Sequence, residues 1–160
     1  MKNIHEIIKI FPVKTEHELQ SVRKIRNQCK HFMTRYNEDI TEKQQSEWFE
    51  KLDHDMNWLF IFNKIYHGVI VDSIGYGFNR IENNSILLTG GLIESERGKG
   101  YGRALFSFLL EHAKAFKLPI KLEVLKNNIP AKKLYESLGF ISINENESSI
   151  KMEYKNDSTI

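Results

Sequence analysis

The sequence is poor in residues that cross-link a chain or bind a metal ion. Cys29 is the single cysteine among 160 residues, which excludes an intrachain disulfide framework. None of the six histidines stands in the His-Glu-x-x-His spacing of a zinc-protease helix. We therefore expect no metal site, and a reducing cytoplasm suits the lone thiol best.

Long apolar runs and a strong net charge are missing as well. No apolar run reaches the roughly 18 residues that a membrane span requires, and His5, Glu6 and Lys9 interrupt the N-terminal segment. The formal net charge is only +2, which argues against a basic nucleic-acid arm. We expect no targeting signal, no membrane partner and no nucleic-acid partner.

The composition that remains is that of a globular protein. Because 41% of the 160 residues are hydrophobic, the chain can bury a sizeable core without disulfides or metals. No repeat, low-complexity segment or linker divides it. We expect a single domain over residues 1–154 and a flexible C-terminal tail over residues 155–160.

Strand and helix signals follow one another along the chain. A β-branched segment at residues 7–11 stops before Pro12 and predicts the first strand. Capping-box pairs, Thr15 with Glu18 and Thr41 with Gln44, predict helices that end near residues 32 and 52. Further strands are expected at residues 57–63, 69–78, 85–93 and 119–125, helices at 100–116 and 130–139, and a final hairpin at 141–145 and 149–154. The unbroken apolarity of residues 85–93 predicts burial on both faces.

The stretch R-G-K-G-Y-G-R, from Arg97 to Arg103, joins one of these strands to the next helix. The first amides of a helix lack internal acceptors and lie at the positive end of its dipole, so such a turn can bind phosphate. Glycines let the backbone approach the anion, and the basic side chains add charge. The spacing matches neither a P-loop nor a dinucleotide fingerprint. On these residues alone, a plain basic turn is an alternative interpretation.

Two motifs together resemble a known family. R-G-K-G-Y-G resembles the R/Q-x-x-G-x-G/A signature of the GNAT N-acetyltransferase superfamily, and LEVLKNNIPAKKLYESLGF, residues 122–140, resembles its second hallmark. Both occur in the family's order, and the match covers Ser85 to Phe140. The resemblance implies an α/β (mixed α+β) fold, with a splayed, mostly antiparallel sheet of about six or seven strands flanked by about four helices. It also implies acetyl-CoA as co-substrate in the gap of the sheet.

The resemblance assigns roles to particular residues. The turn amides would hold the CoA pyrophosphate, backbone groups at the end of the preceding strand would pair with the pantetheine arm, and an asparagine would bind the pantetheine side. Tyr135 matches the family's proton donor to the departing thiolate. Glu123 occupies the position of a base in relatives that acetylate protein N-termini. The expected cofactor ligands are Leu92, Ile93, Arg97, Gly98, Lys99, Gly100, Tyr101, Gly102, Arg103 and Asn128.

Amine chemistry explains why a base is needed. A lysine-like amine with a pKa of about 10.4 is neutral in only about one molecule in 2500 at pH 7, and only the neutral form attacks a thioester. Glu123 is the first candidate, and Glu94, where the family often has proline, is the second. The alternatives are a solvent-facing strand residue for Glu123, an ion pair with Arg97 for Glu94, and a core aromatic for Tyr135. The histidines at 31, 54 and 112 are interpreted as surface or core residues.

The acceptor is expected to contact the first two helices. Arg23 and Arg26 share a helix face that could bind an anion, or that is simply solvated. Residues 23–52 are also similar to GNAT enzymes that acetylate nucleotide-linked sugars. We expect transfer to a primary amine of a small molecule, on an amino sugar or nucleotide-linked sugar. The alternatives are a protein N-terminus of the ribosomal-protein type, or an acyl-CoA-binding module without catalysis. A homodimer is left open, and Glu94 is a further candidate for acceptor binding.

Overall fold

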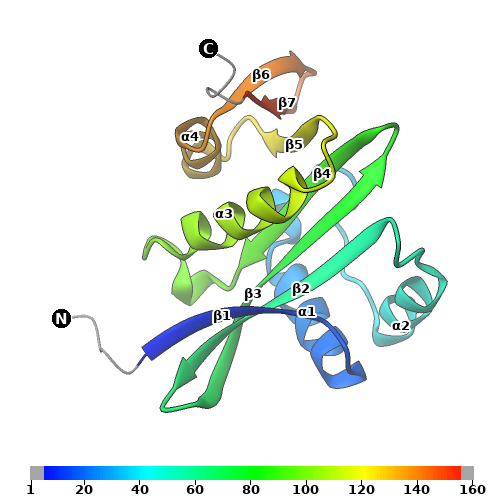
Figure 1. Cartoon of the computed structure of the whole chain (residues 1–160), viewed down its shortest axis with the longest axis vertical. Coiled ribbons are helices and arrows are strands. Elements are labelled where there is room, and N and C mark those ends of the chain that lie inside the picture. The colour runs from blue at the N-terminus through cyan, green and yellow to red at the C-terminus, as the bar shows by residue number, and fades with distance from the viewer. Residues whose placement is uncertain (1–5, 156–160) are drawn as a thin grey trace.

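A computed structural model describes residues 6–155 as a seven-stranded sheet with helices on both faces (Figure 1). The strands are β1 (Glu6–Pro12), β2 (Asn57–Tyr66), β3 (Val69–Glu82), β4 (Ser85–Leu92), β5 (Ile120–Leu125), β6 (Phe140–Glu145) and β7 (Ser149–Tyr154). The helices are α1 (Glu16–Gln28), α2 (Glu42–Lys51), α3 (Tyr101–Lys114) and α4 (Ile129–Ser137), with short 3₁₀ turns at Lys30–Phe32 and Glu94–Glu96. The expected mixed α/β architecture is confirmed. Residues 156–160, most of the expected flexible tail, lie outside the described residues.

The sheet has the order β1-β2-β3-β4-β5-β7-β6. Its pairings are antiparallel, except that β4 and β5 run parallel. Two-residue turns join β2 to β3 at His67 and Gly68, and β3 to β4 at Asn83 and Asn84. All four residues have positive φ, as a type I′ hairpin turn requires. The second turn lets β3 continue to Glu82, beyond the predicted end at residue 78.

Capping fixes where the first two helices begin. Thr15 Oγ1 accepts a hydrogen bond from the Glu18 N–H at 3.1 Å, and Thr41 Oγ1 accepts one from the Gln44 N–H at 3.1 Å. Both predicted capping boxes are therefore confirmed. Helix α1 stops at Gln28, however, and the 3₁₀ turn follows it, so the helix predicted to reach residue 32 is divided.

The core has a part on each face of the sheet. On one face, α3 and α4 cover a large cluster that includes Ile86, Leu105 and Leu109. On the other, α1 covers a smaller cluster that includes Leu19 and Val22. A Cβ on Gly77 of β3 would lie 2.6 Å from a methyl carbon of Leu109, so glycine is needed for α3 to pack this closely. This packing fixes the N-terminus of α3 beside the end of β4.

The prediction that residues 85–93 are buried on both faces is only half right. Ser85, Ile86 and Leu88 are buried, whereas residues 89–92 are partly exposed. The reason is that the second half of β4 lines a cleft. Its apolar and glycine residues therefore form the wall of an opening in the core.

Candidate active site

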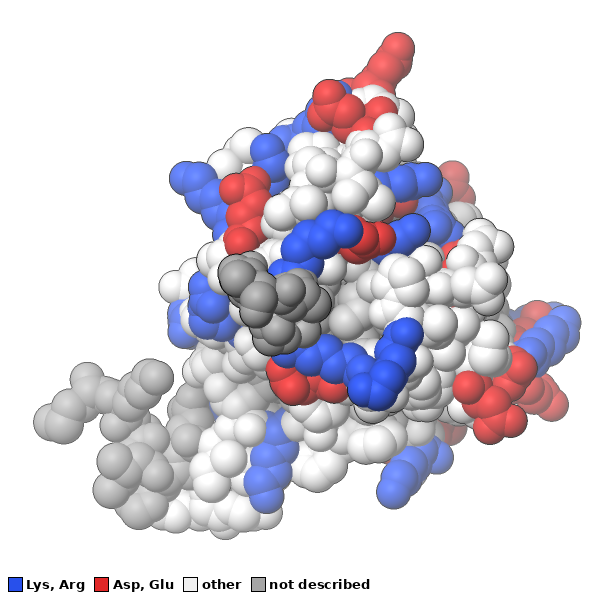
Figure 2. Space-filling model, turned by 45° about the horizontal axis from the view of Figure 1, so that its top comes forward, with Lys and Arg blue, Asp and Glu red and all other residues white. Residues whose placement is uncertain are grey.

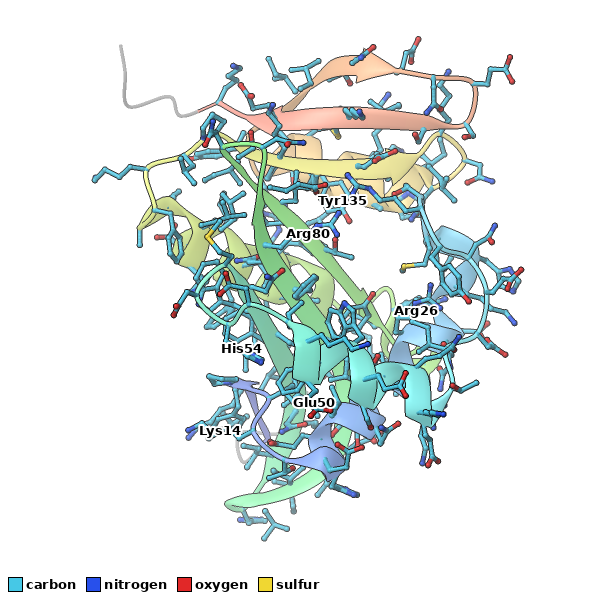
Figure 3. The ribbon with its side chains drawn as sticks, turned by 90° about the vertical axis from the view of Figure 1, so that its right-hand side faces the viewer. Lys14, Arg26, Glu50, His54, Arg80 and Tyr135 are labelled. Atoms are coloured by element: carbon cyan, nitrogen blue, oxygen red, sulfur yellow. The ribbon has the colours of Figure 1, made fainter. Side chains whose placement is uncertain are left out.

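A cleft of about 1200 Å³ opens where β4 and β5 separate. Parallel pairing joins Ile86 to Ile120 and Leu87 to Lys121, after which the strands diverge. The second half of β4 forms one wall, and β5 with the start of α4 forms the other. The loop after α1 and one side of α2 close the far end. Figure 3 labels three residues that line the cleft: Tyr135 of α4, Arg80 of β3 and Arg26 of α1.

The glycine-rich turn lies at one end of the cleft. Gly98 and Gly100 have φ values of 76° and 88°, in the left-handed region that favours glycine. Gly100 is the N-cap of α3 and, as a glycine, has no side chain to cap the helix. The backbone amides of Gly102 and Arg103 lie in the first turn of α3, at the positive end of the helix dipole, where an anion is favoured. Arg97 and Arg103 line the cleft beside them, and Arg103 also donates a 2.6 Å hydrogen bond to Ser137 Oγ.

The edge of β4 presents main-chain groups to the cleft. The Ile93 N–H donates to the Ile74 carbonyl at 2.9 Å, and the Ile86 N–H donates to the Pro119 carbonyl at 2.9 Å. Hydrogen bonding alternates along an antiparallel strand, so the odd-numbered residues of β4 bond to β3. The N–H and C=O of Gly90 and the N–H of Leu92 therefore point to the cleft. Ile93, expected beside Leu92 as a cofactor ligand, uses its amide within the sheet. Gly90 was not among the predicted ligands, because no motif selects it.

Asn128 and Tyr135 lie on the opposite wall. Asn128 is the N-cap of α4, and its Oδ1 accepts a hydrogen bond from the Ala131 N–H at 3.4 Å. Tyr135 is 9% exposed, and its ring lies 4.9 Å from that of Phe106. Burial raises the pKa of the Tyr135 phenol well above its usual value. The phenol is therefore protonated throughout the neutral pH range.

Glu123 of β5 lines the same wall of the cleft. Its side chain is 18% exposed, so the alternative of a solvent-facing strand residue does not describe it. Oε1 accepts a 2.8 Å hydrogen bond from Ser149 Oγ on β7, and Oε2 lies 4.0 Å from Arg35 Nε. A carboxylate held in this way can accept a proton from a group in the cleft.

The two arginines expected to bind the acceptor are placed differently. Arg23 lies outside the cleft, where its Nε donates to Gln20 and its guanidinium lies 3.6 Å from Glu42. Arg26 lines the cleft, but its guanidinium donates to the carbonyls of Tyr36 and Glu38. The shared basic face therefore serves mainly to hold the loop between α1 and α2.

Several other predicted residues also lie away from the cleft. Glu94 is exposed on the 3₁₀ turn, and its neighbour Glu96 forms the ion pairs, 3.1 Å from Lys64 and 3.4 Å from Lys99. Tyr101 lies with its ring 6.4 Å from that of Phe62, on the α3 side of the sheet. Lys99 and Tyr101 thus contribute to the turn through their backbone. Of the histidines, His31 is exposed, His54 contacts the Phe49 carbonyl, and His112 contacts Asn79.

The sequence reasoning missed a group of cleft residues from distant elements. They share one feature, a charged or aromatic side chain on the α1 and α2 side of the sheet. β3 supplies Tyr76, Phe78 and Arg80 at every second position, so the strand alternation could have found them. Glu82 continues this series at the end of β3. The others come from single positions, whose joint location depends on the tertiary fold: Arg35, Trp48 and Lys151.

The splayed sheet, the glycine-rich turn and the buried tyrosine at the cleft agree with a family match that covers most of the chain. Residues 19–140 match the acetyltransferase (GNAT) family. The chain belongs to the GNAT family. It is thus an N-acetyltransferase by family, as the two motifs predict. No curated protein sequence matches the chain.

Solved structures share the fold at low sequence identity. An N-acetyltransferase from Staphylococcus aureus Mu50 is 18% identical, with a TM-score of 0.75 over 92% of this chain and 96% of that one. The ribosomal-protein-S18-alanine N-acetyltransferase of Escherichia coli is 19% identical, with a TM-score of 0.69 over 92% and 93%. Spermidine N-acetyltransferase of Vibrio cholerae, solved with CoA and spermine, is 21% identical, with a TM-score of 0.73 over 94% and 96%. These likenesses confirm the GNAT fold.

Charged side chains are distributed over the surface. Figure 2 shows basic and acidic side chains interspersed on the face it presents, without one large patch of either sign. Between residues 6 and 155, no group of three or more His, Cys, Asp or Glu side chains is arranged to hold a metal ion. No helix in that same range is long and apolar enough to cross a membrane.

Proposed function

We propose that the protein transfers the acetyl group of acetyl-CoA to a primary amine of a small molecule. The observation that carries this proposal is the cleft between β4 and β5, which has an anion-binding helix start at one end and Tyr135 and Glu123 on one wall. CoA has a pyrophosphate, a long arm with amide groups, and a thiol end. The cleft offers a matching feature for each.

The cofactor would lie along main-chain groups. The amides from Gly98 to Arg103 would hold the pyrophosphate, with Arg97 and Arg103 adding charge. Gly90 and Leu92 would pair with the pantetheine arm as a short extra strand. Asn128 would bind the other side of the arm. Acetyl-CoA supplies the thioester from which the acetyl group leaves.

Glu123 and Tyr135 would handle the protons. Glu123 accepts a proton from the bound ammonium of the acceptor, directly or through water, because only the neutral amine has a free lone pair for attack. The neutral amine forms the new C–N bond as the C–S bond breaks, and the nitrogen then loses its second proton to water, which leaves a neutral amide and the CoA thiolate. A thiol has a pKa of about 8.5, below that of the buried phenol, so Tyr135 keeps its proton and donates a hydrogen bond to the departing thiolate.

Support for a nucleotide-linked sugar as acceptor is weaker than for the transfer itself. That expectation depended on a free basic face formed by Arg23 and Arg26, and those side chains bind the protein's own groups. A protein N-terminus stays as the alternative acceptor, because Glu123 is in the cleft where the resemblance to such enzymes expects a base. We also propose that residues 1–154 form one domain, supported by the single sheet from Glu6 to Tyr154.

Two measurements test this function. Acetyl-CoA at a hundredfold excess over Kd should stabilise the fold by about 2.7 kcal/mol, seen as a higher Tm. Release of free thiol from acetyl-CoA should then depend on an added amine. Absence of a Tm shift at millimolar acetyl-CoA would contradict the cofactor assignment. Binding without thiol release for any amine would instead favour the non-catalytic acyl-CoA module.

A further inference from the structure

The end of the cleft opposite the glycine turn contains a chain of alternating charges. Arg80 of β3 lies with its guanidinium 3.2 Å from Glu82 Oε2, and Arg35 lies 3.3 Å from that same oxygen. Arg35 also approaches Glu123 Oε2 at 4.0 Å. The order is therefore Arg80, Glu82, Arg35, Glu123, and all four line the cleft.

The arginines in this chain are not saturated by the carboxylates. A guanidinium has five N–H donors, and a single oxygen of Glu82 receives one contact from each of the two arginines. Arg80 Nε is buried and has no hydrogen-bond partner among the described residues. Burial, and next the charge of Arg35, lower the pKa of the Arg80 guanidinium. An anion bound beside Arg80 would stabilise the charged guanidinium and so oppose the lowering of its pKa.

The balance of charge in this part of the cleft is positive. Apart from the two arginines at the glycine turn, five cationic side chains and two carboxylates line the cleft. The cations are Arg26, Arg35, Arg80, Lys121 and Lys151, and the carboxylates are Glu82 and Glu123. A polyamine would bring a second ammonium against these guanidiniums, which costs energy at short range. An anion on the acceptor would be attracted instead.

We propose that the acceptor is a compact zwitterion, an amine that carries a carboxylate or a phosphorus oxyanion a few bonds away. The anionic group is bound by Arg80 and Arg35, and the ammonium is bound by Glu123, which then takes its proton. The short spacing follows from the 4.0 Å between Arg35 Nε and Glu123 Oε2. This inference rests on the proposed function and names the substrate class of its acceptor site.

The floor of the same region accommodates the rest of the acceptor. Trp48 of α2 and Phe78 of β3 line the cleft, with ring centroids 5.3 Å apart in an edge-to-face arrangement. Such a surface accepts an apolar or flat side chain on the zwitterion. Glu82 contacts both arginines and so fixes their orientation.

The experiment compares matched acceptors with thiol release as the readout. The panel contains the common α-amino acids, 2-aminoethylphosphonate, the methyl ester of each amino acid, and spermidine. The inference expects at least one acid to be acetylated, with kcat/KM at least tenfold above that of its own methyl ester and above that of spermidine. An ester or spermidine that reacts as well as every acid overturns it.

Variants connect the selectivity to the arginines. Arg80→Gln should raise KM for the acid at least tenfold and leave the ester nearly unchanged, while Arg80→Lys should recover only part because it lacks the planar fork. Lys43→Gln, 85% exposed on α2, is the matched control and should change neither. If Arg80→Gln fails to fold, the comparison of acid and ester on the unaltered protein still decides.

Failure of the inference and failure of the proposed function give different results. If acetyl-CoA does not raise the Tm, the proposed function fails. If acetyl-CoA binds and the best acceptor is an ester, a neutral amine or spermidine, the function holds and the zwitterion is wrong. Binding of acetyl-CoA with no turnover of any anionic amine in the panel also overturns the inference.

Discussion

The glycine-turn side of the cleft and the charged side opposite it are built from different parts of the chain. The first uses main-chain groups of one continuous stretch, from Gly90 to Arg103. The second uses side chains from the loop after α1, from α2, β3, β5 and β7. Backbone groups can bind one fixed cofactor whatever the surrounding residues are. A site made of side chains can change its ligand through single substitutions, so we expect acceptor choice to reside there.

Tyr135 lies where the two sides meet, and its substitution should have the largest effect. Tyr135→Phe keeps the ring contact with Phe106 and removes the hydrogen-bond donor. We expect kcat to fall by about 10² to 10³, because the departing thiolate loses the hydrogen bond that stabilises it. The fall is not larger because a thiolate already leaves well. Acetyl-CoA affinity should be retained. Turnover at the unaltered rate would return Tyr135 to a packing residue.

Gly100→Val should impair acetyl-CoA binding without altering the acceptor side of the cleft. A β-branched residue resists φ of 88°, and its side chain would enter the space above the first amides of α3. A Cβ there meets nothing within 4 Å, so the protein itself does not obstruct it. We expect the Tm shift by acetyl-CoA to be lost. Gly100→Asn, which tolerates this conformation better, should retain more of the shift than valine does. Equal shifts in all three proteins would contradict the assignment.

Glu123→Gln should slow the removal of a proton from the acceptor amine. The amide can still accept the hydrogen bond from Ser149 but cannot take a proton. We expect kcat/KM at pH 7 to fall by about 10 to 10², and the deficit to shrink as pH rises and the amine becomes neutral unaided. The check is a pH profile of both proteins. A deficit that stays constant up to pH 10 would assign Glu123 a binding role only.

Gly91→Ala should show how closely the C-terminal end of α1 packs against β4. A Cβ at Gly91 would lie 2.7 Å from Cys29 Sγ, so the helix end has to shift, and we expect a loss of about 1 to 3 kcal/mol in the free energy of unfolding. Cys29→Ala removes that sulfur. The double variant should lose less than the two single losses combined, measured by urea unfolding. Additive losses would show that the two positions are independent.

Arg23→Ala should have the smallest effect, and it sharpens the boundary of the acceptor side. Arg23 lies outside the cleft and binds Gln20 and Glu42, so acceptor KM should stay within about twofold of the unaltered value. Steady-state kinetics with the best acceptor of the panel provide the check. A tenfold rise in KM would restore the basic face of α1 as a binding surface.

The sequence predicted the fold well because its signals are local, and the proposed cofactor residues lie within equally short motifs. Capping boxes, strand patterns and the two motifs each lie within a short window, and the helices and strands were found near their predicted positions. Strand pairing adds detail that the motifs do not contain. The Ile93 amide bonds within the sheet, whereas the alternation of the ladder directs the amides of Gly90 and Leu92 to the cleft.

The acceptor side was harder to predict because its residues meet only through the tertiary fold. Arg35 and Arg80 are far apart in sequence, and both contact Glu82. Strand alternation places Arg80 and Glu82 on one face, but no spacing rule indicates the contact of Arg35 with Glu82. Arg26 was a reasonable candidate by its helix face, yet the loop carbonyls of Tyr36 and Glu38 use its donors. Helical periodicity identifies a face and leaves open what that face binds.

Hydrogen exchange with and without acetyl-CoA tests the central claim, that the cofactor lies along β4 and the start of α3. Saturating acetyl-CoA should slow exchange at least tenfold at the amides of Gly90 and Leu92 and from Gly98 to Arg103. The exposed end of β3, residues 69–71, provides the internal control and should not change. Bound acetyl-CoA that leaves the β4 and turn amides unprotected, or that protects another face of the sheet, would contradict the account.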